Sequence, residues 1–469
     1  MKPFALSALG GILFVTALPP TGFAPFALFC FVPLLYVAQK YNVVRATAAS
    51  ALFGLIAYVS IPTSLLLWGW AATSVALFVA SATFAVPLFL AKLLSVRTSI
   101  QSPWVFFPLT FVIGQYFFEQ LSVPVSLSVM YPVEWLNGGL LFRSVGSHGV
   151  DFLICTINVL VAAILLEKKK ALYAMTLATV IAFLALLHII TSFSHTEATY
   201  ERLKIITVDN AVSFRRARSS AFSLTVREDM VRQLDELTEA AISQSPDLVL
   251  LPEGGNGIAN SQIASRRQYF ERLADIKKFR LLAGSKFIMK DGTEWNQADY
   301  IVNGAFEQRI FKAKSVPLLE DATPANNSGV ISVNGHILGV GICFDVAFSE
   351  VIASLVDQGA SAIIVISNDA SFGETGLSQL HLRYASVRAL ESGRQILFFS
   401  NTGPSIMISA QGRLVSGYMS SNKPRLEEHV VGLTNSQPGS RIVRSSVYVG
   451  MVLFVFTGLL LSYRKGLGK

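Results

Sequence analysis

Three residues in the second half of the chain have side chains that could together perform covalent catalysis. Glu253 follows the apolar run 248–252, and Cys343 closes the apolar run 337–342. Lys312 lies beyond a predicted hairpin. A cysteine nucleophile needs a base that takes its proton and a positive charge that holds the oxyanion. Because a glutamate can be the base and a lysine the charge, the three residues together indicate a nucleophilic site.

Each of these residues also has an ordinary structural interpretation when it is taken alone. A carboxylate at the end of a strand can cap a turn, and a free cysteine is often a small buried hydrophobe. A single lysine is usually solvated. The catalytic interpretation therefore depends on the combination of the three residues.

The elements that must position these residues are short strands and helices. Between residues 200 and 440, β-branched runs alternate with helical stretches, which predicts a layered α/β or α+β domain. The predicted strands cover 203–208, 247–251, 280–284, 300–303, 336–343, 362–367, 395–400 and 405–409. The predicted helices cover 224–243, 261–278, 349–358 and 378–392.

The order Glu, Lys, Cys, with gaps of about 60 and 30 residues, resembles the carbon-nitrogen hydrolase (nitrilase) superfamily. Apolar runs before and after the domain resemble, within that superfamily, the apolipoprotein N-acyltransferase family. The motifs that carry this resemblance are Leu251-Pro252-Glu253, Phe311-Lys312 with Val316-Pro317 and Glu320, Gly341-Ile342-Cys343-Phe344-Asp345, the stretch 367–373, His381, the stretch 388–394, and Asn401-Thr402-Gly403. The proline five residues beyond Lys312 selects that lysine over Lys314.

The sequence departs from the family pattern around the substrate. Phe344 stands where the acyltransferases carry a tyrosine, Asp345 replaces a glutamate and Ser371 replaces a tryptophan. Gly254-Gly255 and Leu318-Leu319 also differ from the usual pairs. We therefore expect the catalytic chemistry to be retained, whereas the residues around the substrate differ from those of the family.

The resemblance implies a two-step acyl transfer with Glu253 as base, Lys312 as oxyanion stabiliser and Cys343 as nucleophile. Glu320, Phe344 through a nearby backbone amide, and Asn368 would support these residues. The implied donor is a phospholipid, and the implied acceptor is the α-amine of the N-terminal diacylglyceryl-cysteine of an apolipoprotein. The family further implies an αββα sandwich for the catalytic domain.

The composition places part of the chain in a membrane. Of the 469 residues, 52% are hydrophobic and 14% are charged, whereas about a quarter are charged in soluble domains. Residues 197–444 carry 26 basic and 26 acidic side chains, so the net charge of +8 belongs to the apolar remainder. The high isoelectric point is therefore no argument for nucleic-acid binding, and we expect no nucleic-acid partner.

Eight apolar runs are candidates for membrane spans, although the first two could instead form a helical hairpin or one span with an interfacial segment. They cover 3–18, 24–39, 46–66, 72–91, 104–122, 150–166, 171–192 and 446–463. With eight spans, every basic cluster falls on one side, which the positive-inside rule makes cytoplasmic. Both termini are then cytoplasmic, and the domain lies in the periplasm of a bacterium.

The predicted architecture is a multi-pass α-helical membrane domain plus a nitrilase-like α+β domain. The membrane domain covers 1–192, the periplasmic catalytic domain 193–445, and a last transmembrane helix with a cytoplasmic tail 446–469. We expect no cofactor and no metal, because metal-ligand spacing, a P-loop and a dinucleotide fingerprint are lacking, and the three cysteines suggest no disulfide framework. Two alternatives stay open: a membrane-anchored amidase or hydrolase, and a scaffold associated with conjugation.

Overall fold

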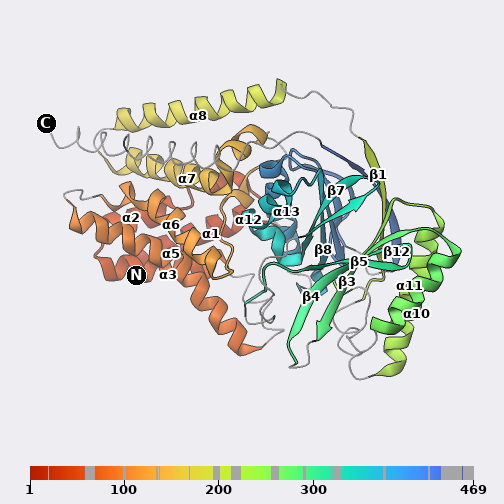
Figure 1. The fold of residues 1–469 in the computed structure, drawn as a ribbon. Coiled ribbons are helices and arrows are strands. Elements are labelled where there is room, and N and C mark those ends of the chain that lie inside the picture. The colour runs from red at the N-terminus through yellow and green to blue at the C-terminus, as the bar shows by residue number, and fades with distance from the viewer. Residues whose placement is uncertain are drawn as a thin grey trace. The chain divides into compact units, whose positions relative to one another are not determined.

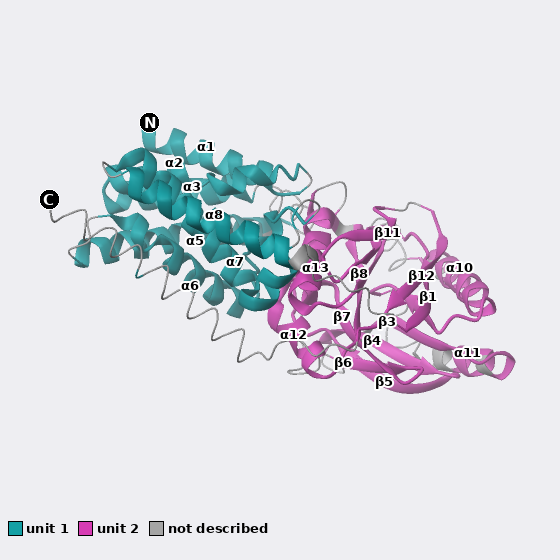
Figure 2. Cartoon of the chain, turned by 90° about the horizontal axis from the view of Figure 1, so that it is seen from above, with its two compact units in different colours: residues 1–196, 439–469 teal, residues 197–438 magenta. Residues whose placement is uncertain are grey.

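The computed structural model describes residues 1–434 and residue 457, except for positions 20, 59–68, 99–101, 134, 135, 137, 168, 169, 194–200, 213–222, 255–262, 289–291, 318, 319, 321–328, 373–375, 421 and 422. The chain divides into two compact units, residues 1–196 with 439–469 and residues 197–438 (Figure 2). The predicted boundaries at 192 and 445 stay a prediction.

The first unit is helical in its described residues. Its α-helices are α1 (Lys2–Ala17), α2 (Val32–Lys40), α3 (Val43–Ala57), α5 (Trp70–Arg97), α6 (Phe107–Gln120), α7 (Gly139–Leu166) and α8 (Lys170–Phe193). Short 3-10 helices are η1 (Ala24–Leu28), η3 (Pro103–Val105) and η4 (Ser128–Met130).

Among the described residues of this unit, three helical segments are long and apolar enough to cross a membrane: Thr73–Arg97, Gly139–Leu166 and Lys170–Ile190. Shorter apolar helices occupy the first three predicted runs, and α6 has only 14 residues, whereas an unassisted crossing takes about 20. The predicted run 446–463 lies outside the described residues apart from position 457. A helical membrane region is therefore confirmed, and the number of eight crossings stays a prediction.

Apolar side chains on α8 remain uncovered by protein. Ile181, Phe183 and Leu186 are each more than half exposed. Several large apolar side chains exposed within two turns of one helix are stable where lipid replaces water. The exposure of α8 thus fits a helix that faces the hydrocarbon.

The second unit contains two six-stranded sheets (Figure 1). The first has the order β12 (Arg425–Gly432), β1 (Arg202–Asp209), β2 (Leu248–Leu251), β3 (Arg280–Ile288), β4 (Glu294–Val302) and β5 (Ala305–Phe311). The second has the order β11 (Leu414–Tyr418), β10 (Ser405–Ile408), β9 (Ile396–Asn401), β8 (Ala362–Asn368), β7 (His336–Ile342) and β6 (Gly329–Val333). In each sheet three neighbouring strands are parallel, β1-β2-β3 and β7-β8-β9, and the outer pairs are antiparallel.

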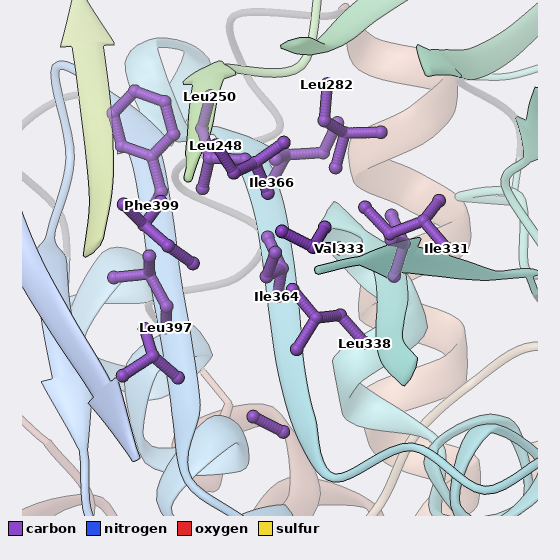
Figure 3. Close-up of a cluster of buried hydrophobic side chains, with 14 of the residues drawn as sticks. Leu248, Leu250, Leu282, Ile331, Val333, Leu338, Ile364, Ile366, Leu397 and Phe399 are labelled. Atoms are coloured by element: carbon purple, nitrogen blue, oxygen red, sulfur yellow. The ribbon is translucent and has the colours of Figure 1, made fainter. Parts of the chain in front are cut away.

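Alternating side chains of the strands build two separate layers of core. Leu248 and Leu250 of β2 point into a cluster that also contains Leu338 and Ile364 of the second sheet (Figure 3). Val249 and Leu251, on the other face of β2, join a second cluster with residues of the flanking helices. Successive strand residues point to opposite faces, so a strand covered on both sides must be apolar throughout.

Helices cover the outer faces of both sheets. The first sheet packs against α10 (Leu224–Ser243) and α11 (Ile263–Ile276), and the second against α12 (Ser349–Asp357) and α13 (Leu377–Ser392). Two sheets between two helical layers form an αββα sandwich, so the predicted fold class is confirmed.

The eight predicted strands and four predicted helices of this unit are all present. The predicted strands did not include β5, β6, β11 and β12, although a hairpin was predicted before Lys312, and the predicted start of β4 was six residues too late. The reason is visible at β11, whose residues Leu414 and Val415 are largely exposed on an edge, so that no continuous apolar run marks the strand. Edge strands are not buried on both faces, so their sequences lack the continuous apolar runs by which central strands are predicted.

Candidate active site

Cys343 lies where β7 ends and the chain turns into η6 (Cys343–Ala347). Its backbone has a φ of 50°, and its side chain is buried. A positive φ is uncommon for a residue with a side chain and costs of order 1–3 kcal/mol, so neighbouring groups must hold it. Such strain is concentrated at functional positions, which is consistent with a nucleophile at this turn.

Lys312 is fully buried and forms ion pairs with two carboxylates. Its Nζ lies 3.2 Å from Glu253 Oε1 and 2.7 Å from Glu320 Oε1. The lysine backbone is also fixed, because its amide donates to the carbonyl of Asn296 at 2.9 Å. The structure therefore brings together a base candidate, a cation and a second carboxylate that lie 67 residues apart in sequence, from 253 to 320.

Asn296 of β4 joins this group, although the sequence reading did not single it out. Its side-chain amide donates to Glu253 Oε1, and it lies 3.2 Å from Glu320 Oε1. The residue is 8% exposed. A polar residue at a buried strand position was the sequence signal that could have identified it, because buried amides need partners.

Glu253 is positioned by a close approach of two backbones. A Cβ on Gly284 of β3 would overlap the carbonyl oxygen of Pro252 and would lie 2.7 Å from the Cα of Glu253. The next residue, Gly254, has a φ of 63°, which glycine adopts without strain. Both glycines thus allow the chain to turn sharply after β2 and place the carboxylate beside Lys312.

Asp345 connects the turn at the nucleophile to the segment that carries the lysine. Its carboxylate accepts the backbone N–H of Ile342 at 3.0 Å, of Ala313 at 3.0 Å and of Lys314 at 2.8 Å. Three backbone donors converge on one buried side chain, so this residue holds two separate segments in register. In the sequence, Asp345 stands out only as a departure from the family pattern.

Burial and charge set the protonation of the group. Burial raises the pKa of the Cys343 thiol, and the carboxylate of Glu253 raises it further, while Lys312 acts in the opposite direction. The net pKa of this thiol lies well above its ordinary value. The resting sulfur is therefore protonated, and a base must remove its proton during attack.

Lys312 and Glu320 are held in their charged forms. Burial by itself lowers the pKa of Lys312, but the nearby Cys343, Glu253 and Glu320 raise it well above the ordinary value. Burial raises the pKa of Glu320, yet Lys312 and hydrogen bonds lower it below its ordinary value. A charged ammonium group whose field reaches the sulfur suits the stabilisation of an oxyanion.

Phe344 and Asn368, the other two predicted supporting residues, contact neighbouring parts of the fold, and their supporting roles stay predictions. The ring of Phe344 packs edge-on against Phe348 at 5.1 Å and against the core between the sheets. Asn368 Oδ1 accepts from Asn401 Nδ2 at 3.0 Å, which links the ends of β8 and β9. The side chain of Ser371 lies outside the described residues.

Within the described part of the chain, no group of three or more His, Cys, Asp or Glu side chains is arranged to hold a metal ion. The three cysteines are free thiols.

The domain that holds this site matches a known family. Residues 285–425 match the family model described as carbon-nitrogen hydrolase. The match begins after Glu253, but it includes Lys312, Glu320 and Cys343. The sequence match and the two-sheet sandwich define the chain as a member of the carbon-nitrogen hydrolase superfamily.

Curated relatives narrow this assignment. A protein of Geobacter metallireducens named apolipoprotein N-acyltransferase is 20% identical over 468 residues, with 88% of this chain and 86% of that protein covered. Proteins of the same name from Aquifex aeolicus and Nitrosomonas europaea are each 28% identical, over 202 and 154 residues. The chain spans 45% and 31% of the length of these two relatives. Within its superfamily, the chain is therefore similar to proteins named apolipoprotein N-acyltransferase, in one case over most of its length.

Solved structures of the superfamily are also similar to this chain. An amidase from Nesterenkonia sp. AN1 gives a TM-score of 0.41 at 17% identity, covering 53% of this chain and 99% of the amidase. A carbon-nitrogen hydrolase from Helicobacter pylori G27 gives 0.40 at 14% identity, covering 55% and 94%.

Proposed function

We propose that this protein transfers an acyl chain from a phospholipid, through a thioester on Cys343, to the α-amine of the N-terminal diacylglyceryl-cysteine of lipoproteins. The observation that carries the proposal is the buried ammonium of Lys312, which forms ion pairs with Glu253 and Glu320 in the same unit as Cys343 at the end of β7. The names of the curated relatives supply the substrate class.

In the first half-reaction, Glu253 removes the thiol proton as the sulfur of Cys343 attacks an ester carbonyl. The C–S bond forms and the carbonyl oxygen becomes an oxyanion, which Lys312 and the backbone amide of Phe344 stabilise. Collapse breaks the ester C–O bond, and protonated Glu253 gives its proton to the departing lysophospholipid alcohol. The acyl chain is then held as a thioester.

In the second half-reaction, the α-amine of the acceptor attacks the thioester carbonyl. Glu253 takes a proton from the amine, the C–S bond breaks, and the sulfur of Cys343 regains a proton. An amide is formed and the enzyme returns to its resting state. Glu320 does not exchange protons in this scheme, because its lowered pKa keeps it ionised as a partner of Lys312.

The membrane region has a physical purpose under this proposal. Both substrates carry acyl chains, and transfer of each buried methylene from lipid into water costs about 0.8 kcal/mol. An enzyme with apolar helices such as α8 can receive both substrates from the bilayer instead of extracting them. We infer that it resides in the bacterial cytoplasmic membrane, with both termini in the cytoplasm and the catalytic unit in the periplasm.

Intact mass spectrometry of the full-length protein tests the proposal. After incubation with phosphatidylethanolamine vesicles, the wild-type protein should carry one acyl adduct, which hydroxylamine removes, and an added diacylglyceryl-lipopeptide should become N-acylated. Cys343→Ala should lack the adduct, whereas Cys155→Ala, a matched change at another buried free cysteine, should keep it. Release of free fatty acid in place of acylated peptide would assign a hydrolase, and an unmodified wild-type protein would leave only a scaffold.

A further inference from the structure

His381 contacts the nucleophile through the backbone and has no part in the chemistry derived above. It lies on α13, and its side chain is 7% exposed. Its Nε2 is 3.0 Å from the carbonyl oxygen of Cys343, and its Nδ1 is 3.2 Å from Asp369 Oδ1. A histidine buried between a carboxylate and a backbone carbonyl needs an explanation, because burial disfavours its charged form.

The partners of His381 determine where its protons are. A carbonyl oxygen can only accept a hydrogen bond, so Nε2 must carry a proton. On the other side, Asp369 Oδ1 already accepts the hydroxyl of Ser367 at 2.7 Å, so Nδ1 also faces an acceptor. Burial lowers the pKa of His381, but the carboxylate of Asp369 and the two hydrogen bonds raise it above its ordinary value. Both ring nitrogens thus face acceptors, an arrangement that the protonated ring satisfies on both sides.

The carbonyl that His381 contacts belongs to the same peptide group as the N–H of Phe344. A peptide group is planar, so a hydrogen bond at its oxygen fixes the direction of its N–H. A charged donor at the oxygen also polarises the group and strengthens the N–H as a donor. The φ of 50° at Cys343 shows that the backbone just before this peptide group is strained, so the turn is one that neighbouring contacts must hold.

The imidazole itself is held in a fixed plane. The rings of Phe398 and Phe372 pack against it at 5.0 and 6.0 Å with steep interplanar angles of 84° and 67°. Asp369 is anchored in turn, because its backbone N–H donates to Ser400 Oγ at 2.9 Å. The path from β9 through Asp369 to the nucleophile therefore has no freely rotating member.

We propose that His381, fixed by Asp369, is the positioning residue that orients and polarises the Phe344 amide for oxyanion binding. This inference rests on the proposed function only in that Cys343 attacks a carbonyl. It does not depend on which acyl donor or acceptor is natural.

Two substitutions of His381 separate positioning from structure. In His381→Gln the side-chain amide nitrogen reaches the position of Nε2 and can still donate to the Cys343 carbonyl, but the contact with Asp369 is lost. In His381→Asn the amide nitrogen reaches only the position of Nδ1, so the contact with Asp369 stays and the one with the carbonyl is lost. His336→Asn is the matched control, since His336 starts the same strand β7 and pairs with Glu201 at 2.7 Å.

The assay is the pre-steady-state burst of nitrophenolate from p-nitrophenyl butyrate with the full-length protein in detergent, corrected with Cys343→Ala. Loss of an oxyanion donor costs roughly 10²–10³-fold, so loss of its orientation should slow the burst of His381→Asn by about 10- to 100-fold with unchanged amplitude. His381→Gln should recover most of the rate, and His336→Asn should match the wild-type protein. Thermal midpoints measured in parallel should not follow this order.

Equal slowing in His381→Asn and His381→Gln, or rates that simply follow the thermal midpoints, would assign His381 a structural role and overturn the inference. A wild-type protein that releases nitrophenolate no faster than Cys343→Ala would overturn it as well, because Cys343 then attacks no carbonyl. If the burst occurs but phosphatidylethanolamine leaves no adduct on Cys343, the proposed substrate is wrong, and the comparison of the two variants still decides the role of His381.

Discussion

Replacement of Lys312 by methionine should reverse how the stability of the catalytic unit responds to pH. Lys312 is 0% exposed, and it separates the carboxylates of Glu253 and Glu320, whose side chains are 9% and 25% exposed. Methionine fills a similar volume without the charge. The variant therefore leaves two carboxylates that share Asn296 but have no cation between them.

The expected size follows from this burial. Removing one partner of a buried ion pair costs about 3–5 kcal/mol, because the remaining charge stays desolvated. For a domain of this size, each kcal/mol lowers the thermal midpoint by about 2–4 °C, so the variant should melt roughly 6–20 °C below the wild-type protein at pH 7. Surface pairs contribute only about 0–1 kcal/mol, so the matched control Lys314→Met, which breaks the more exposed pair with Glu350, should change the midpoint little.

The direction of the pH effect distinguishes this explanation from a packing defect. In the wild-type protein the pKa of Glu320 is lowered, so its contribution to stability is present above the ordinary glutamate pKa and is lost as pH falls. In Lys312→Met the two carboxylates repel each other, so one of them gains a raised pKa and favours the folded state only when protonated. The deficit should therefore shrink between pH 7 and pH 5.

The assay is thermal unfolding of the full-length proteins in detergent, followed by tryptophan fluorescence at pH 5, 6 and 7. The second variant Lys312→Met/Glu320→Gln should recover part of the loss at pH 7, because one of the two unpaired charges is removed. A deficit that is the same at all three pH values, or no recovery in the double variant, would show that lost packing and not charge determines the stability.

Two further predictions concern the residues that hold the site together. Burial raises the pKa of Asp345 to about 6, so the stability difference between wild-type protein and Asp345→Asn should fall as pH rises from about 4 to 6, measured as the difference in thermal midpoints. An unchanged difference would mean that Asp345 does not take up a proton on folding. Gly284→Ala should lower the free energy of unfolding by about 1–3 kcal/mol and slow the acylation of Cys343, because the added methyl group displaces the backbone at Glu253. In the control Gly335→Ala the Cβ position is open, so this variant should show only the strain of its φ of 84° and acylate normally. Normal acylation by Gly284→Ala would show that the base tolerates this displacement.

The central strands and the site residues were readable in the sequence for related physical reasons. A strand that is covered on both faces must be apolar along its length, as in β2 and most of β8. Such a run can be recognised in the sequence without knowing which strand it pairs with. Glu253 and Cys343 were recognisable because each interrupts or closes such a run. The membrane region was equally plain, since long apolar runs without charge have few other interpretations.

The tertiary structure alone decided which distant groups meet. The sequence does not indicate that Asn296 bridges two carboxylates or that Asp345 ties the lysine segment to the turn at Cys343. Strand pairing brings these residues together from distant parts of the sequence. A buried amide or carboxylate can form its hydrogen bonds with many different partners. The contact of His381 with the Cys343 carbonyl is of the same kind. The local pattern fixes elements and faces, whereas this hydrogen bond depends on how α13 packs against η6.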